Sequence, residues 1–361
     1  MKMTKPEKRS KLDTILGRAA DGAALSSEEI LFLLSLEDKS DTERLFQTAR
    51  ETRKRHFGDQ VYLYGFIYFT TYCRNDCAFC FYRRSNSESE RYRKSPAEII
   101  ATAEKLVESG VHLLDLTMGE DPRYFSEGGF DELLETVAAV KRTANLPVMI
   151  SPGVVPRDIL DAFKAIGVEW YACYQETHNR ELYGRLRLNQ DFDERLELKK
   201  YARRIGFLIE EGLLAGIGES AEDLCHSFRV MDQIGADQVR VMSFIPQKGT
   251  PLENLQTMPR LREMLVIAVM RLLFPDRLIP ASLDVDGLAG LKQRLNAGAN
   301  VVTSLIPPGR GLLGVSQSTL DIGDGSRTAA GIVPILEECR LEPASRQNYL
   351  DWIEKERSGR L

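Results

Sequence analysis

The stretch "VYLYGFIYFTTYCRNDCAFC", residues 61–80, opens the part of the chain in which a single structural pattern repeats. Its first nine residues are apolar and rich in β-branched and aromatic side chains, which is typical of a buried strand. A polar loop with cysteines follows, and an amphipathic run, "SPAEIIATAEKLVESG", begins at residue 95. A strand, a loop and a helix in this order predict a parallel sheet covered by helices.

The pattern of a strand followed by a helix recurs along the chain. Further strands are expected at 112–119, 147–153, 170–177, 208–218, 238–246, 277–284 and 300–308. Nearly all of them are followed by a helical run. Eight such units over about 250 residues predict an α/β fold, a (β/α)8 barrel of the TIM type. An open doubly wound sheet is the alternative.

Both ends of the chain differ from this pattern. We expect an N-terminal helical extension at 1–57, because "SSEEILFLLSL" has a serine cap and acidic residues before a leucine face. The barrel is expected at 58–320, and a C-terminal extension with a loop and a helical segment at 321–361. We expect the two extensions to cover the two ends of the barrel.

The bulk composition excludes several classes of function. The net charge is −5, which gives no support for binding to nucleic acid or to an anionic membrane. No apolar run reaches the roughly 18 residues of a membrane-spanning helix. The start of the chain is charged and has no apolar signal region, so we predict a cytoplasmic protein that acts on a small molecule.

Three of the six cysteines, Cys73, Cys77 and Cys80, lie within eight residues. A structural zinc site needs four ligands, and the chain has no second cysteine pair. A thioredoxin-like pair would leave Cys73 unused. An iron–sulfur cube normally takes four thiolates, so three would leave one iron open to chelate a substrate or cofactor. A zinc site or another non-catalytic metal cluster remains an alternative.

Charged and polar residues close several of the predicted strands, where the active site of such a barrel lies. Arg240 can bind a carboxylate, and Asp115, Ser282 and Asp284 can accept hydrogen bonds from ammonium groups. One guanidinium and two separate carboxylates match a diamino acid. For each of these residues, the alternative is a buried ion pair of the barrel.

The cysteine run after the first strand, with Phe79 before its last cysteine, resembles the signature of the radical S-adenosylmethionine (SAM) enzymes. The resemblance implies a 4Fe-4S cluster held by Cys73, Cys77 and Cys80, with its fourth iron open to SAM. An electron from an external donor, such as flavodoxin or ferredoxin, would cleave SAM to methionine and a 5′-deoxyadenosyl radical.

Other segments resemble the SAM-binding elements of this superfamily. "TMGED" (117–121) resembles a Gly-Gly-Glu element, although Met118 replaces the first glycine. "YQET" (174–177) and "FDERLE" (192–197) resemble the Glu and Arg pair of the branch that contains biotin synthase and the FeFe-hydrogenase maturase. The residues that the resemblance implies as SAM contacts are Phe79, Glu120, Ser151, Glu176 and Arg195.

The run Gly216-x-Gly218-x-x-Ala221 is a weak dinucleotide fingerprint when taken alone. In the superfamily, this strand end lets the backbone approach adenine. A tight turn between a strand and a helix remains an equal alternative.

Longer phrases, including "LDLTMGEDPRYF", "YQETHNRELYGRLR" and "LFPDRLIPASLDVDGL", resemble the methylornithine synthases of pyrrolysine biosynthesis. The resemblance implies a mutase that isomerises L-lysine to (3R)-3-methyl-D-ornithine by fragmentation and recombination at Cα–Cβ. It also implies substrate contacts by Asp115, Arg240, Ser282 and Asp284. A maturase-like radical lyase that acts on another small amino acid is the alternative enzyme.

The remaining cysteines, Cys173, Cys225 and Cys339, lie too far apart in the sequence to hold a second cluster, which argues against sulfur insertion. We expect them to be thiols of the hydrophobic core.

Overall fold

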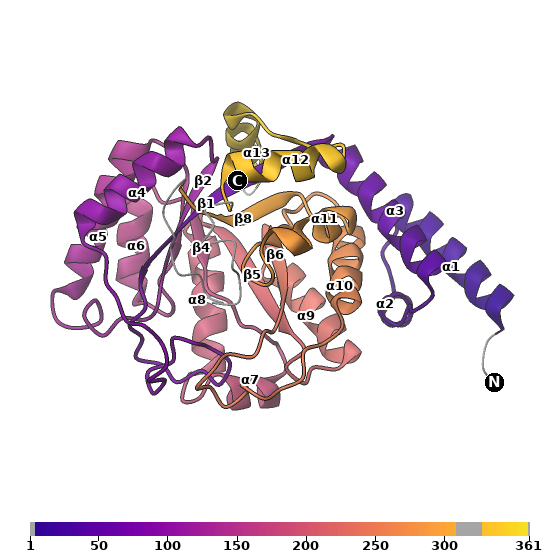
Figure 1. Ribbon diagram of the computed structural model, residues 1–361, viewed down its shortest axis with the longest axis horizontal. Helices are drawn as coiled ribbons and strands as arrows, with labels where there is room; N and C mark the ends of the chain where they lie inside the picture. Colours follow the sequence, from indigo (N-terminus) through magenta and orange to yellow (C-terminus); the bar gives the residue numbers. More distant parts are fainter. Residues whose placement is uncertain (1–3, 308–326, 360–361) are drawn as a thin grey trace.

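The computed structural model describes residues 4–307 and 327–359 and is built around a barrel of parallel strands (Figure 1). The barrel strands are β1 (Gln60–Thr70), β2 (Leu113–Met118), β3 (Val148–Ser151), β4 (Trp170–Ala172), β5 (Leu208–Ala215), β6 (Gln238–Ser243), β7 (Pro280–Ser282) and β8 (Val301–Leu305). Each strand lies where the sequence predicts one.

The strands pair in the order β6-β5-β4-β3-β2-β1-β8-β7. A single parallel bridge between Gln238 and Leu278 joins the two ends of this order. In it, the Val239 amide donates to the Leu278 carbonyl at 3.0 Å. The sheet is therefore a nearly closed (β/α)8 barrel, which confirms the predicted fold, and the open doubly wound alternative is wrong.

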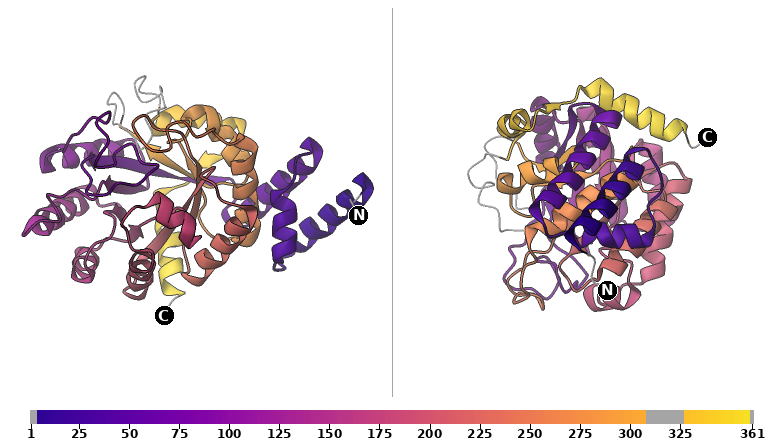
Figure 2. Two further views of the ribbon diagram at one scale, coloured as in Figure 1. Left: turned by 90° about the horizontal axis from the view of Figure 1, so that it is seen from below. Right: turned by 90° about the vertical axis from the view of Figure 1, so that its right-hand side faces the viewer.

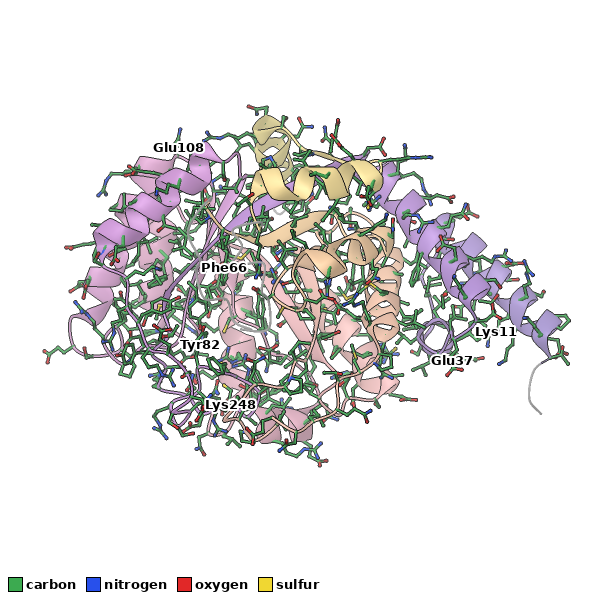
Figure 3. The ribbon with its side chains drawn as sticks, viewed as in Figure 1. Lys11, Glu37, Phe66, Tyr82, Glu108 and Lys248 are labelled. Carbon is green, nitrogen blue, oxygen red and sulfur yellow. The ribbon has the colours of Figure 1, made fainter. Side chains whose placement is uncertain are left out.

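Helices surround the barrel, and local sequence fixes where several of them begin. They are α4 (Pro96–Glu108), α5 (Gly129–Ala144), α6 (Arg157–Ile166), α7 (Arg180–Leu186), α8 (Phe192–Arg204), α9 (Ala221–Gln233), α10 (Arg260–Leu273) and α11 (Leu288–Asn296). Ser95 with Glu98 and Ser220 with Asp223 form capping boxes at α4 and α9. In Figure 3, Phe66 and Tyr82 lie within the body of the protein, where both are buried, whereas Lys11, Glu37 and Glu108 lie toward its outer edge.

Several strands are shorter at their carboxyl ends, where the polar residues lie, than the sequence pattern predicts. β4 ends at Ala172, and Glu176 beyond it has a φ of 67°. β5 ends at Ala215 because Gly216 turns the chain with a φ of 88°. The predicted ranges included residues 173–177 and 216–218, because the sequence pattern does not mark the point at which strand pairing stops.

The N-terminal helices α1 (Lys5–Ala20), α2 (Ser27–Leu34) and α3 (Lys39–Phe57) project from one side of the barrel (Figures 1 and 2). The expectation that they cover an end of the barrel is wrong, because α2 and α3 pack against α10. α10 is buried from Glu263 to Leu272. A helix that is apolar all round needs a cover on its outer face as well, and α2 and α3 supply it.

The C-terminal segment covers the N-terminal end of the barrel. It contains α12 (Ala329–Glu338), β9 (Glu342–Pro343) and α13 (Arg346–Ser358), and β9 pairs with the start of β1. Tyr349 of α13 shares a 2.8 Å hydrogen bond with Tyr64 inside the barrel. Trp352 stacks on Trp170 of β4 with the ring centroids 5.9 Å apart. This aromatic layer seals the end opposite the strand carboxyl ends.

In the described residues, no helix combines the length and the apolar character that crossing a membrane requires. The division of the chain at 57/58 and 320/321 remains a prediction, and its second boundary lies outside the described residues.

Candidate active site

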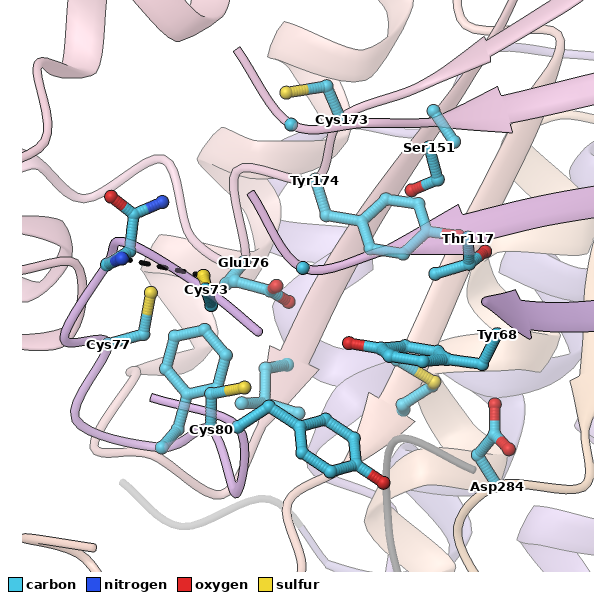
Figure 4. A pocket seen from close by; sticks show the side chains of 18 of the residues that line it. Tyr68, Cys73, Cys77, Cys80, Thr117, Ser151, Cys173, Tyr174, Glu176 and Asp284 are labelled. Atoms are coloured by element: carbon cyan, nitrogen blue, oxygen red, sulfur yellow. Dashed lines mark hydrogen bonds between the residues drawn. The ribbon is translucent and has the colours of Figure 1, made fainter. Parts of the chain in front are cut away.

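A cavity opens at the carboxyl ends of the strands, and the predicted site residues converge on it (Figure 4). Those that line it are Cys73, Cys77, Phe79, Cys80, Asp115, Glu120, Ser151, Glu176, Arg195, Arg240 and Asp284. Ser282 is the exception: it is buried on β7, and its hydroxyl accepts a 3.3 Å hydrogen bond from the Asp284 amide. In Figure 4 the three cysteines lie on one side of the cavity and Asp284 on the other.

The loop that carries the cysteines is held by backbone hydrogen bonds. The Arg74 amide donates to the Glu120 carbonyl at 2.8 Å, and the Ala78 amide donates to the Leu186 carbonyl at 2.7 Å. The loop also passes so close to Gly119 that a Cβ there would lie 2.3 Å from the Tyr72 carbonyl oxygen. A glycine at 119 is therefore a condition for this loop path.

Glu120 is the acceptor at the centre of a cationic cluster next to the cysteines. Its carboxylate accepts from Arg74 Nε at 2.9 Å, from Arg195 Nη2 at 3.4 Å and from the Val154 amide at 3.1 Å. Gly153 leaves room for this carboxylate, since a Cβ there would lie 2.3 Å from it. These contacts fix Glu120 at the edge of the cavity.

Glu176 is held by both its backbone and its side chain. Its carbonyl accepts from the Leu214 amide, and its carboxylate accepts from Arg187 Nη2 at 2.8 Å. Burial raises the pKa of the Glu176 carboxyl, and the Arg187 guanidinium opposes that rise. Arg187 belongs to the loop after α7, and the sequence pattern did not predict it as a site residue.

Behind Glu176, a second buried carboxylate supports the loop. Glu211 follows Glu210 on β5, so the two side chains point to opposite faces of the sheet. Glu211 pairs with Lys199 of α8 and accepts from the Gln175 amide at 2.8 Å. Although burial opposes ionisation, Lys199 holds the pKa of the Glu211 carboxyl at about 2.

Cys173 departs from the expectation of a simple core thiol. It is buried, but it lines the cavity, and Arg195 Nη1 lies 2.9 Å from its sulfur. Cys225 on α9 is buried away from the cavity, and Cys339 caps the end of α12. The sequence could not separate these three cysteines, because each stands alone and belongs to no motif.

Arg240 is both part of a buried ion pair and an unused donor. Its Nε donates to Glu210 at 2.6 Å, and Glu210 also accepts from Gln238 and from the Tyr174 hydroxyl. Within the described chain, Arg240 Nη2 is buried and has no hydrogen-bond partner. A buried donor without a partner is costly, which makes this nitrogen a ready site for an anionic group of a ligand.

Asp284 is also paired. Its carboxylate accepts from the Ser304 hydroxyl at 2.6 Å and from Arg327 Nη2 at 2.5 Å. Ser304, the residue before the last of β8, has a φ of 69°, and its hydroxyl points to Asp284. Arg327 is 1% exposed, and no sequence signal marks it, because it lies in the C-terminal segment far from any strand pattern.

Asp115 differs from the other carboxylates of the cavity. It accepts a 2.8 Å hydrogen bond from the Thr117 hydroxyl, and no cation of the described residues lies within ion-pair distance of it. Burial, and after it the charge of Glu210, raises the pKa of the Asp115 carboxyl to about 7. An incoming ammonium group would supply the missing positive charge.

Comparison with known proteins agrees with this geometry. A family model described as the radical SAM superfamily matches residues 67–231. The chain is 43% identical to the 3-methylornithine synthase of Methanosarcina acetivorans, over 94% of this chain and 96% of that protein. The chain belongs to the 3-methylornithine synthase family.

Two further proteins place this family among its relatives. A crystal structure of methylornithine synthase has a TM-score of 0.89 and 42% identity, and the match covers 94% of this chain and 99% of that one. The FeFe hydrogenase maturase subunit HydE of Thermotoga maritima is 31% identical over 74% of this chain and 77% of that protein. The 3-methylornithine synthase family is thus related to a maturase of the same superfamily.

As a radical SAM enzyme of the 3-methylornithine synthase family, the protein uses a 4Fe-4S cluster and SAM. The three thiols fit such a cluster. Burial raises the pKa of the Cys80 thiol, and the neighbouring Cys77 and Cys73 raise it further. Three thiolates at this place would repel one another, so they need a positively charged group between them. No three His, Cys, Asp or Glu side chains of the described chain converge on a single metal ion. A cube of irons and sulfides takes one thiolate for each iron, so three thiols on one loop suit it better than they suit a single ion.

The Gly216–Gly218 run forms a tight turn. The Gly216 and Ile217 amides donate to the Glu219 carboxylate, each at 2.9 Å. These backbone donors are therefore satisfied within the chain, and the turn interpretation is favoured over a nucleotide fingerprint.

Proposed function

We propose that the protein isomerises L-lysine to (3R)-3-methyl-D-ornithine as the first step of pyrrolysine biosynthesis, and the name of the 3-methylornithine synthase family supports this product. The observation that carries the substrate class is the pairing of charges in the cavity. Among the residues that the structure describes, Asp115 has no ion-paired cation and Arg240 Nη2 has no acceptor, and both lie in the same cavity as the three cysteines. A zwitterion with a further ammonium group satisfies both.

The cysteines and the charged residues next to them form the cofactor end of the cavity. With a 4Fe-4S cluster and SAM bound, this end would supply a 5′-deoxyadenosyl radical that removes hydrogen from the lysine side chain. Cys73, Cys77 and Cys80 would hold the cluster, and Glu120, Glu176 and Arg195 would hold the methionine part of SAM. Phe79 and Ser151 would contact the rest of SAM. An external one-electron donor such as flavodoxin or ferredoxin would work with the enzyme in a reducing cytoplasm.

The opposite side of the cavity would hold lysine. Arg240 would take the carboxylate, and Asp115 and Asp284 would take the ammonium groups, with Ser282 fixing the Asp284 backbone. A Cα–Cβ fragmentation gives two pieces that must stay aligned and dry until they rejoin. Tyr68 and Tyr174 line the cavity between its two sides and are suited to exclude water (Figure 4).

The test is anaerobic incubation of the reconstituted protein with SAM, a reductant and L-lysine. We expect a new compound with the mass of lysine that separates from it by chromatography. Cys77→Ala is the control: it is expected to lose iron and turnover while the circular dichroism spectrum is retained. Cleavage of SAM to 5′-deoxyadenosine without a lysine isomer would instead support the maturase-like lyase. A wild-type protein that holds no four-iron cluster would contradict both.

A further inference from the structure

Gln190 lies in the loop between α7 and α8, in a conformation that directs its side chain inward. The preceding residue, Asn189, has a φ of 59°, a left-handed conformation that few residues adopt. The Gln190 amide nitrogen of the backbone donates to the Arg187 carbonyl at 3.1 Å, which closes the turn. The loop therefore holds Gln190 in place against the cysteine loop.

The side-chain amide of Gln190 bridges a cysteine and two arginines. Its Nε2 lies 3.0 Å from the sulfur of Cys77. Its Oε1 accepts from Arg195 Nη2 at 2.8 Å and from Arg187 Nη1 at 3.3 Å. A guanidinium group can only donate, so the amide oxygen must face the arginines and the NH2 group must face the sulfur. The Cys77 sulfur is consequently the acceptor of this hydrogen bond.

We propose that Gln190 tunes the reduction potential of the iron–sulfur cluster through its hydrogen bond to the Cys77 sulfur. The proposal rests on the cluster of the proposed function and adds a residue that the signature does not contain. Gln190 acts through Cys77 and is not itself a ligand.

The direction of the effect follows from charge. Reduction adds an electron to the cluster, and part of that charge falls on the ligand sulfurs. An N–H group that donates to a ligand sulfur stabilises the reduced form and makes the potential more positive. Removing this donor should therefore make the cluster harder to reduce.

Gln190 is the side chain through which this effect can be varied. Cys73 receives the Asn75 backbone amide at 3.5 Å, and backbone donors remain in any variant. Arg187 Nη1 also points toward the Cys77 sulfur, but at the longer distance of 3.7 Å. Gln190 donates at 3.0 Å and can be replaced without changing the backbone or the net charge.

The experiment compares the wild type with Gln190→Leu, which keeps the size of the side chain and removes the donor. Each protein is reconstituted anaerobically without SAM or lysine, and its midpoint potential is measured by redox titration followed by electron paramagnetic resonance. We expect Gln190→Leu to hold the same iron per chain and to have a more negative midpoint potential. Asn189→Gly is the matched control, since it keeps the left-handed turn and leaves the amide in place, and we expect its potential to equal that of the wild type.

The outcomes separate this proposal from the proposed function. A wild type that loads four irons, with a Gln190→Leu variant of equal potential, overturns the role of Gln190 alone. A Gln190→Leu variant that fails to retain iron while Asn189→Gly loads normally also overturns it, because Gln190 would then be needed for assembly. A wild type without four irons overturns the proposed function.

Discussion

Arg327 donates a hydrogen bond to Asp284, although 43 positions separate the two residues in the sequence. Both side chains are almost completely buried, at 1% and 8% exposure. The segment that follows the barrel thus places the Arg327 guanidinium group at the carboxyl end of β7, next to the cavity. A buried carboxylate of the proposed lysine site therefore depends on the C-terminal part of the chain for its counter-charge.

Arg327→Gln is expected to destabilise the protein by about 3–5 kcal/mol, because it leaves the Asp284 carboxylate buried without a cation. The double variant Arg327→Gln/Asp284→Asn should recover most of this loss, since neither charge remains. Urea denaturation measures both. The control is Lys292→Gln, which breaks a pair whose members are 52% and 59% exposed and should change the stability little. Equal stability of Arg327→Gln and the wild type would mean that the pair does not stabilise the fold.

Lysine binding should strengthen as the pH rises through about 7, where Asp115 loses its proton. The neutral acid cannot attract an ammonium group, so below that pH the affinity should fall by about tenfold for each pH unit. Calorimetric titration of L-lysine into the cluster-loaded protein at several pH values measures this. Asp115→Asn should bind lysine weakly at every pH, and a pH profile unchanged by this substitution would remove Asp115 from the ammonium site.

The same carboxyl should make the empty protein less stable as the pH rises. Its folded pKa of about 7 lies above its ordinary value of 3.8, so the neutral form is favoured by folding. The stability that this carboxyl contributes is complete below about pH 4 and is lost as the pH rises through about 7. Melting temperatures of the wild type and Asp115→Asn should therefore diverge over that window, with the variant the more stable at pH 8. Parallel curves would contradict the raised pKa.

Gly119→Ala should impair cluster loading, because the added Cβ would lie 2.3 Å from the Tyr72 carbonyl oxygen, a backbone atom next to Cys73. The cysteine loop would have to move away from its present path. We expect a clear loss of iron per chain, measured colorimetrically after reconstitution. The matched control is Gly17→Ala in α1, where no atom lies within 4 Å of the new Cβ and helix propensity favours alanine. Normal iron content in Gly119→Ala would show that the loop can shift.

The barrel could be predicted because the periodicity of each strand or helix, and the order in which strands and helices alternate, can be read from the sequence alone. Each apolar run gave a strand, and the polar residues after the runs reached one cavity because parallel strands share a carboxyl edge. Asp284 was found in this way, whereas Asp115 and Arg240 lie within β2 and β6 and were found as charges inside apolar runs. The partners of these residues were not found. Glu210 lies in a run that predicts an apolar strand, and its pairing with Arg240 depends on the register of β5 with β6.

Other residues that sequence reasoning missed belong to a loop after a helix end and to the C-terminal segment. Arg187 and Gln190 lie in a loop whose path depends on packing against the cysteine loop, and a polar loop residue carries no periodic signal. The place of the N-terminal helices was also predicted incorrectly. The signal that could have corrected it is α10, whose run "MLVIAVM" is too apolar for a helix with one face in water.

Arg240→Lys should weaken L-lysine binding by roughly 10- to 100-fold while the fold is kept. Lysine at 240 can still neutralise Glu210, so no buried carboxylate is left unpaired, but it lacks the second nitrogen that Arg240 directs to the substrate carboxylate. The loss of a charge-assisted hydrogen bond of about 1.5–3 kcal/mol corresponds to this range. Calorimetric titration of both proteins with L-lysine measures it.

The control ligand for Arg240→Lys is 1,5-diaminopentane, which keeps two ammonium groups and lacks the carboxylate. If Arg240 binds the carboxylate, the wild type and the variant should bind this diamine with equal affinity, although both bind it more weakly than the wild type binds lysine. An equal loss for the diamine and for lysine would mean that the substitution changes the shape of the cavity or the pairing of Glu210. The ratio of the two losses therefore separates recognition of the carboxylate from support of the barrel interior.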